Sequence, residues 1–212
     1  MTYEALMSLL QSRRSVRRFR SDRPSRETLT RLIEAAVAAP SASNKQPWRF
    51  FVVEDLALIT RLADDVRAAV DRIARHIEPA QESAFRAYGD YFTRFEAAPV
   101  VIVALYRPLA VLSNLVSVEL PEADRTRIAA LERGSGLVGT SMALSNLLLA
   151  AHAMGLGASG LTGPLVAEDA FRARLEIPDS WSIAAIVAVG YADETPAATS
   201  RKPVANVVRW IE

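Results

Sequence analysis

The sequence predicts an α+β fold in which helices cover a central sheet of buried strands. Two near-continuous apolar runs, 99–105 and 183–190, have the length and the composition of strands that are buried on both faces. Around these runs, apolar residues recur at helical spacing. Half of the 212 residues are apolar, which is enough for one substantial core, so we expect a single domain over 1–212.

The first half of the chain alternates helices with one strand. Apolar residues at helical spacing predict a helix over 3–12. A second helix is expected to begin near Ser25, a residue type that caps helix N-termini, and to end before Pro40. Aromatic and β-branched residues over 49–53 predict a strand. The pattern over 56–96 predicts one or two long helices.

The second half contains a less regular stretch, a helix and a tail. Residues 106–133 are more polar and are expected to form a lid or excursion over a site, where such segments carry specificity. The segment 137–154 is apolar nearly all round and predicts a buried helix. The tail, 192–212, has little core of its own, so it must lie against another surface.

The pattern G-x-G-x-x-G at 134–139 does not predict a dinucleotide site. That fingerprint needs a strand before it and an acidic residue roughly 20 positions later. A charged stretch, 124–133, precedes these glycines instead, and serine and glycine stand near position 159. We therefore interpret the pattern as a loop that leads into the buried helix.

Composition argues against several classes of function. The chain has no cysteine, which excludes disulfides, thiol nucleophiles and thiolate metal sites. Its two histidines, His76 and His152, are far apart, so no metal site is expected. The net charge of +1 does not favour nucleic acid as a partner. We expect no signal peptide, no membrane contact and a cytoplasmic protein, because the first ten residues lack a signal pattern and the apolar runs are interrupted.

A cluster of arginines near the N-terminus predicts an anion site. Residues 13–19 read RRSVRRF and place several guanidiniums and a hydroxyl within about one turn. Arginine donates a planar fork of N–H groups that matches phosphate oxygens, and we expect Arg13, Arg14 and Arg17 to bind the anion. The alternative is a solvated, arginine-rich helix face. The other arginines of this region are expected at the surface: Arg18, Arg20, Arg23 and Arg26.

A polar loop bracketed by prolines follows this cluster. Residues 40–50 read PSASNKQPWRF and lie between two apolar elements. Short hydroxyl and amide side chains can bond the edge of a planar heterocycle, although serine and asparagine are also common in a capped turn. Together, the two segments predict a phosphorylated, flat ligand with a polar edge. Flavin mononucleotide (FMN) fits that description.

These motifs resemble those of the nitroreductase family, which comprises FMN-dependent flavoenzymes that use NAD(P)H. Further matching segments follow in the family's order: NLLLAA at 146–151, GLG at 155–157, GLTG at 160–163, GY at 190–191 and RKP at 201–203. The resemblance implies a three-layer α/β/α fold with a mixed or antiparallel central sheet. It also implies an obligate homodimer that holds FMN at its interface and exchanges the C-terminal arm, 192–212.

The resemblance also implies roles for individual residues. Arg17 would face the pyrimidine edge of the flavin. The residues implied at the phosphate and ribityl end are Arg13, Arg14, Ser15, Arg201 and Lys202. The loop of the other subunit would contribute Pro40, Ser41, Ala42, Ser43, Asn44 and Gln46. Backbone donors near flavin N5 and O4 would come from Leu161, Thr162 and Gly163.

Two features depart from the family's pattern or extend it. Many members carry an asparagine and, three residues later, a lysine before the first buried strand, and these positions are Asp90 and Thr93 here. Either Arg94 supplies the missing charge or the redox tuning differs. An aromatic stripe at helical spacing serves either core packing or the stacking of an aromatic acceptor; its members are Tyr88, Tyr91, Phe92 and Phe95.

The implied activity is ping-pong hydride transfer from NAD(P)H through flavin N5 to a small electron-poor acceptor such as a nitroaromatic or a quinone. No side-chain acid or base is obligatory in such a reaction, so no catalytic residue is predicted. One alternative is a flavin-binding or regulatory protein without a productive NAD(P)H site. Others are dehydrogenation, dehalogenation or breakdown of the flavin. A further alternative, an anion- or RNA-binding module, fits poorly with the near-neutral charge and the buried strands.

Overall fold

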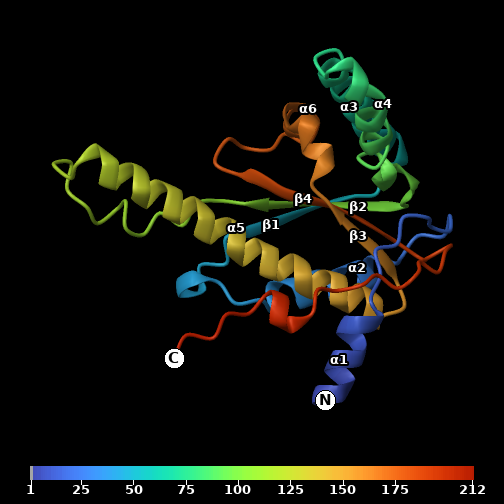
Figure 1. Cartoon of the computed structure of the whole chain (residues 1–212), viewed down its shortest axis with the longest axis horizontal. Helices are drawn as coiled ribbons and strands as arrows, with labels where there is room; N and C mark the ends of the chain where they lie inside the picture. Colours follow the sequence, from blue (N-terminus) through green and yellow to red (C-terminus); the bar gives the residue numbers. More distant parts are fainter. Residues whose placement is uncertain (1) are drawn as a thin grey trace.

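The computed structural model describes residues 2–212 and has a four-stranded sheet between two layers of helices (Figure 1). The strand order is β1-β2-β4-β3, and all neighbouring strands are antiparallel. The strands are β1 (Trp48–Val53), β2 (Val100–Tyr106), β3 (Gly157–Leu161) and β4 (Ser182–Gly190). The helices are α1 (Tyr3–Ser12), α2 (Arg26–Val37), α3 (Leu56–Ala74), α4 (Pro79–Gly89), α5 (Glu122–Ala153) and α6 (Glu168–Arg174). The predicted α+β, three-layer architecture is confirmed.

The two central strands are the apolar runs that the sequence predicts as buried strands. β2 and β4 pair directly, with Ile102 opposite Val187 and Val103 opposite Ile186. Successive side chains of a strand point to opposite faces. Val103 therefore joins the core under α3 and α6, whereas Ile102 joins the core under α2 and α5. A strand that is covered on both faces must be apolar throughout, which explains the continuous runs.

The edge strand β3 is missed by the sequence analysis, which assigns no strand to this segment. Four of its five residues are glycine, alanine or serine, and none is β-branched, so the local sequence carries little strand signal. The strand forms because Ala158 pairs with Val189 of β4. Gly157 lies so close to the N-terminal segment that a Cβ there would be 2.7 Å from the side chain of Val16. Long-range pairing and this close approach therefore override the weak local preference.

Helix α5 begins earlier than predicted. It runs unbroken through 134–139, so the expected loop at this glycine pattern is wrong. The irregular excursion covers 107–121 and does not extend to 133. Each glycine weakens a helix by roughly 1 kcal/mol relative to alanine, but tertiary contacts require small residues here. A Cβ at Gly136 would lie 2.1 Å from the Arg107 carbonyl oxygen, and one at Gly139 would lie 3.3 Å from Pro47.

Only one stripe of α5 is buried, although the sequence predicts a helix buried all round. Ala143, Leu147 and Ala151 are fully buried against the sheet and α2. Val138 and Met142 on the other side are 54% and 44% exposed. The amino-terminal part of α5 projects from the body of the molecule together with the excursion (Figure 1), so the side of the helix that carries Val138 stays exposed. By length and composition alone α5 could cross a membrane, but its buried stripe packs as that of a core helix.

The tail after β4 runs over the surface. A bridge between Phe19 and Ala192 and a hydrogen bond from the Asp193 N–H to the Arg18 carbonyl oxygen (3.0 Å) hold its beginning. Every residue from 197 to 212 is exposed. The tail therefore leaves a set of apolar side chains without cover: Val204, Val207, Val208, Trp210 and Ile211.

Candidate functional site

The basic motif lies along the free edge of β3. The Val16 N–H donates to the Ala158 carbonyl oxygen at 3.1 Å, and Ser15 forms a parallel bridge with Ala158. The Arg20 N–H donates to the Tyr191 carbonyl oxygen at 2.9 Å. The segment after α1 is therefore extended and tied to the sheet at two points. Because it is not helical, its arginines do not form the face of a helix.

The arginines of this region fall into two groups. Four have a carboxylate within 4.0 Å: Arg18 with Glu194, Arg20 with Asp22, and both Arg23 and Arg26 with Glu54. No carboxylate in the described part of the chain lies that close to Arg13, Arg14 or Arg17, which are all half-buried. The guanidiniums of Arg14 and Arg17 donate to backbone oxygens, Arg17 to that of Ser15 at 3.2 Å. Three positive charges are therefore left without a carboxylate partner in one short segment.

Glu194 in the tail fixes the backbone of the basic motif. Its carboxylate accepts the N–H groups of Arg17 at 2.5 Å and Arg18 at 3.0 Å. The hydrogen bond from the Arg17 backbone, opposed by burial and aided by the bond from Arg18, holds the pKa of Glu194 below its ordinary value. The sequence analysis missed this residue, because nothing local marks an acid in the tail as a partner for a segment near the N-terminus.

The polar loop at 40–46 is a strained, outward-facing turn. Ser43, Asn44 and Gln46 have φ angles of 49°, 50° and 47°, which lie in the left-handed region that residues with a side chain rarely adopt. Ser41 stabilises the turn, because its Oγ accepts the Gln46 N–H at 2.9 Å. The side chains from Ala42 to Gln46 are exposed. The loop is therefore a capped turn, and the amide side chains of Asn44 and Gln46 point away from the core.

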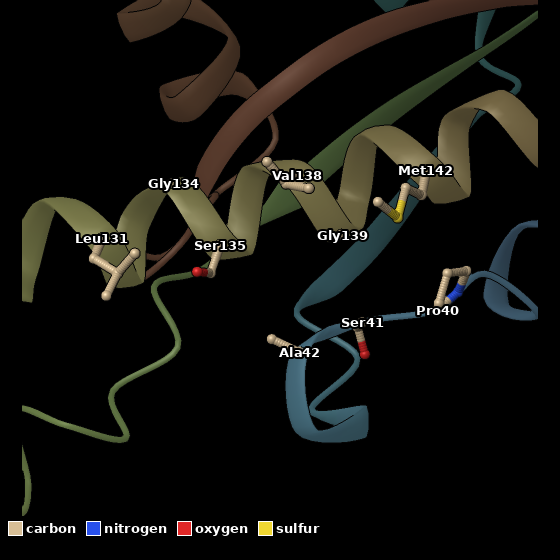
Figure 2. A pocket seen from close by; sticks show the side chains of 9 residues that line it. All are labelled: Pro40, Ser41, Ala42, Leu131, Gly134, Ser135, Val138, Gly139 and Met142. Carbon is tan, nitrogen blue, oxygen red and sulfur yellow. The ribbon is translucent and has the colours of Figure 1, made fainter. Parts of the chain in front are cut away.

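This loop and α5 enclose a pocket of about 490 Å³ (Figure 2). The wall is largely apolar, and Figure 2 shows the side chains of Leu131 and Met142 on the side of α5 that faces the loop. Gly139 allows the close approach of the two elements, because a Cβ there would lie 3.3 Å from Pro47 and 3.4 Å from the Cβ of Ser41. The pocket is lined by Pro40, Ser41, Ala42, Leu131, Gly134, Ser135, Val138, Gly139 and Met142.

The turn after β3 is held by an aromatic ring. Leu161 ends the strand, Thr162 is exposed, and Gly163 begins a short 3-10 helix. A Cβ at Gly163 would lie 2.1 Å from the Phe92 ring, so the ring rests directly on the glycine. This contact requires glycine. Helix α5 ends before this turn, at the C-terminal cap that the φ of 74° at Gly155 marks, so the turn is not part of the helix end.

The aromatic stripe divides into a buried half and an exposed half. Phe92 and Phe95 are buried in the core. Tyr88 and Tyr91 are 62% and 47% exposed. The guanidinium of Arg94 lies over the Tyr91 ring, 3.9 Å from its centroid. Core packing therefore accounts for the two phenylalanines and not for the two tyrosines.

A second pocket, of about 490 Å³, connects the basic motif with the segment before β2. Arg17 lines it from one side and Thr93 and Arg94 line it from the other. Asp90, the other position that departs from the family's pattern, does not line this pocket, and its carbonyl oxygen accepts the Thr93 hydroxyl at 3.3 Å.

Comparison with known proteins identifies the family. The model of the Nitroreductase family matches residues 10–191. The chain belongs to the nitroreductase family. It is 32% identical to a protein of Thermus thermophilus named NADH dehydrogenase, over 93% of this chain and 92% of that protein. It is 30% identical to the 5,6-dimethylbenzimidazole synthase of Rhodospirillum rubrum, over 90% of this chain and 83% of that protein.

Solved structures agree with this assignment. A BluB-like flavoprotein from Clostridium difficile has a TM-score of 0.85 and 25% sequence identity, and the match covers 98% of this chain and 99% of that chain. A nitroreductase with bound FMN from Desulfitobacterium hafniense has the same fold, with a TM-score of 0.69, 24% identity and full coverage of both chains. This nitroreductase-family chain is therefore a flavoprotein oxidoreductase by family.

Within one copy of this nitroreductase-family chain, the predicted site residues lie in separate places. The basic motif and the 161–163 turn both adjoin β3. The 40–46 loop lines a different pocket, on α5. Arg201 and Lys202 are exposed in the tail, and the guanidinium of Arg201 donates only to Thr199 and Ser200 among the described residues.

A buried glutamate that the sequence analysis missed anchors the excursion. Glu132 on α5 is 6% exposed. Its carboxylate accepts the Val111 N–H at 2.7 Å, the Ser113 N–H at 3.0 Å and the Ser113 hydroxyl at 2.7 Å. Burial alone would raise the pKa of Glu132, but these hydrogen bonds outweigh burial and hold the pKa below its ordinary value. A charged side chain in a polar stretch gives no local sign that it will be buried.

Replacing Glu132 by glutamine is expected to reduce the free energy of unfolding by about 1–3 kcal/mol at pH 7, because the variant loses charge-assisted hydrogen bonds. The folded-state pKa is depressed, so the stabilisation is present above the unfolded pKa and is lost as the pH falls through the folded pKa. The difference between wild type and variant should therefore shrink in acid. Urea unfolding at pH 7 and at about pH 4 measures it.

The matched control is Glu122→Gln on the same helix. The side chain of Glu122 is 78% exposed and, among residues 2–212, forms an ion pair with Arg125 alone. Its loss should cost less than about 0.5 kcal/mol. Equal effects of the two substitutions would contradict the anchoring role of Glu132.

Proposed function

We propose that this chain is an FMN-dependent oxidoreductase that passes hydride from NAD(P)H to a small electron-poor acceptor and works as a homodimer. The observation that carries this proposal is the presence of three guanidiniums without carboxylate partners, in a region where the other arginines are paired. The segment that carries them lies beside β3, and the Thr162–Gly163 turn follows the carboxyl end of that strand. A ligand with a phosphate at one end and a flat ring at the other would match this arrangement, with the phosphate at the arginines and the ring at the turn.

The phosphate end of the proposed site consists of Arg13, Arg14 and Ser15. A half-buried guanidinium without a counter-ion is costly unless a ligand supplies negative charge. Arginine and hydroxyl donors suit a phosphate of the kind that FMN carries. Arg201 and Lys202 are proposed to join this end, since they are exposed and no described carboxylate lies within 4.0 Å of Arg201.

The ring end of the proposed site consists of Arg17 and the 161–163 turn. The contact between Phe92 and Gly163 fixes the turn, which supports a role for its backbone donors in orienting the ring near N5 and O4. Bound FMN supplies the hydride chemistry itself. The protein binds and orients the cofactor, excludes water from one face and provides positive charge at the pyrimidine edge.

Three features support a homodimer in which each copy completes the site of the other. The 40–46 loop and the basic motif line different pockets within one copy. The outer side of α5 and the tail expose apolar side chains that a second copy would cover. Among the described strands, β1 pairs only with β2, and its other edge, where Val52 is 39% exposed, is free to receive an arm.

One relative favours a second candidate function. The relative named 5,6-dimethylbenzimidazole synthase covers most of both chains. The dimethylbenzene part of that product is also present in the flavin ring, so oxidative breakdown of the flavin by dioxygen is the alternative reaction. The excursion at 107–121, which the buried Glu132 anchors, is proposed as the lid that governs which reactant reaches the ring.

An anaerobic absorbance spectrum tests the proposed function. The purified protein should show a flavin spectrum that bleaches when NADH or NADPH is added and returns when a quinone or nitroaromatic is added. A spectrum that stays oxidised with both donors would favour a binding or regulatory role. Permanent loss of flavin in air, with 5,6-dimethylbenzimidazole as product, would favour the second candidate. Absence of bound flavin even after FMN is added would refute both.

Arg13→Ala is expected to weaken FMN binding by roughly tenfold to a hundredfold, because a charge-assisted bond to phosphate is worth about 1.5–3 kcal/mol. Quenching of FMN fluorescence on titration with apoprotein measures the dissociation constant. The matched control is Arg20→Ala, since Arg20 is exposed and already pairs with Asp22. The assignment fails if the two variants bind FMN equally well.

Removal of residues 197–212 is expected to shift the protein from dimer to monomer and to lower FMN occupancy, because the arm would no longer cover the second copy. Light scattering coupled to gel filtration measures the mass. Trp210→Ala, which changes one of the exposed apolar residues, should weaken the dimer less. A full-length protein that is monomeric at micromolar concentration would contradict the dimer proposal.

A further inference from the structure

A third pocket, at the base of the excursion, contains positive charge without a counter-ion. It has a volume of about 520 Å³, and its walls include Lys45, Arg107, Leu109 and Val111. Lys45 comes from the 40–46 loop, and Arg107 is the first residue after β2. Within residues 2–212, no carboxylate lies within 4.0 Å of either cation. Two unneutralised positive charges therefore line this pocket.

Strand pairing brings Lys45 and Arg107 to the same end of the sheet. Trp48 at the start of β1 pairs with Tyr106 at the end of β2. The pairing continues one residue beyond both strands, because the Arg107 N–H donates to the Pro47 carbonyl oxygen at 3.1 Å. Lys45 lies only two residues before this contact. The backbone therefore holds two like charges near each other, an arrangement that a bound oxyanion would stabilise.

A buried tryptophan holds a further guanidinium beside this pocket. Trp181, which is 7% exposed, directly precedes β4. The guanidiniums of Arg49 and Arg107 lie 4.6 Å and 5.3 Å from the centroid of its ring. A cation–π contact orients a guanidinium without neutralising its charge. In the described part of the chain, Arg49 also has no carboxylate within 4.0 Å, so the ring collects two charged groups.

Two carboxylates of the adjoining segments are engaged elsewhere. The Glu132 carboxylate accepts the Val111 N–H at 2.7 Å, and the Glu132 carbonyl oxygen accepts the Leu109 N–H at 3.1 Å. Glu132 does not line the pocket, and these bonds fix the pocket wall to α5. Asp179 pairs with Arg172 at 3.4 Å. The pocket is therefore preformed, and its charge is left for a ligand.

This basic pocket adjoins the apolar pocket between the 40–46 loop and α5. The loop supplies walls to both, with Lys45 in one and Ser41 and Ala42 in the other. The Arg107 carbonyl oxygen also packs closely on Gly136, inside the 134–139 run that lines the apolar pocket. The 40–46 loop is the element proposed to contact the FMN of the second copy. The basic pocket therefore lies directly beside the proposed flavin site.

We propose that the pocket of Lys45 and Arg107 is an anion subsite that binds a phosphate or carboxylate group of the molecule that reacts at the flavin. This inference rests on the proposed function and narrows its reactants to acidic ones. Guanidinium and ammonium donors suit such oxyanions. The apolar walls at Leu109 and Val111 suit the carbon frame next to the anionic group.

The test compares anionic and neutral reactants in holoprotein that carries Lys45→Ala or Arg107→Ala. The donors are NADPH and NADH, which carry phosphates, and N-benzyl dihydronicotinamide, which carries none. The acceptors are para-nitrobenzoate and neutral nitrobenzene. Each substitution should lower kcat/KM roughly tenfold for an anionic reactant and leave its neutral counterpart unchanged, a moderate loss because both side chains are exposed to water. Anaerobic stopped-flow absorbance follows flavin reduction and reoxidation separately.

The half-reaction that responds identifies the source of the anion. A selective loss with NADPH and NADH assigns the subsite to the phosphates of the donor, and one with para-nitrobenzoate assigns it to an acidic acceptor. Arg107→Lys keeps the charge and should retain most of the preference. The matched control is Arg61→Ala on α3, since Arg61 pairs with Asp55 and lies outside the pocket. It should leave every rate unchanged.

Two kinetic outcomes would overturn the inference and leave the proposed function standing. One is an unchanged rate for every anionic reactant in both alanine variants. The other is an equal loss for anionic and neutral reactants, since that would indicate a general disturbance of the loop.

A measurement that does not depend on flavin separates the two proposals. Calorimetric titration with inorganic pyrophosphate should show weaker binding to Arg107→Ala than to the wild type. Equal binding, or none to either protein, would overturn the subsite. Failure of the wild type to bind FMN would remove the proposed function, and the pyrophosphate titration would still decide whether this pocket binds anions.

Discussion

The antiparallel pairing of β2 with β4 is the constraint on which the rest of the structure depends. Because both strands are central, each buries its two faces, and the sheet separates one core under α3 and α6 from another under α2 and α5. Full burial of each large apolar side chain contributes roughly 1.5–3 kcal/mol. The pairing also gives β3 an edge position, and the basic motif can lie beside Ala158 only because that edge is free.

The candidate site is defined as much by its carboxylates as by its arginines. Glu54, Asp22 and Glu194 neutralise the arginines that face the surface and leave the charge at Arg13, Arg14 and Arg17. Glu194 has a second role, because it binds the backbone of the motif and so connects the tail to the N-terminal segment. Selective pairing also occurs in the pocket that Arg17 lines, where Glu96 pairs with Arg67 and Arg94 is left without a carboxylate partner.

Elements with a local signal could be predicted from the sequence. Ser25 caps α2 as expected, with its Oγ accepting the Thr28 N–H, and the helix ends before Pro40. β3 and the continuity of α5 through 134–139 could not be predicted, because glycine-rich segments have no strong local preference and here tertiary contacts decide their conformation. The departure of Thr93 from the family's lysine is visible in the sequence, but the position of Arg94 over Tyr91 is not.

The sequence by itself determined the class of fold, the family and the residue types available for an anion and a flat ring. It did so because hydrophobic periodicity, caps and prolines act within a few residues of one another. The tertiary structure decided which arginines are neutralised, that Glu132 is buried and that Phe92 lies on Gly163. These outcomes depend on residues far apart in the sequence, such as Arg17 and Glu194, whose contact exists only after the basic motif has docked on β3 and the start of the tail has paired with Phe19.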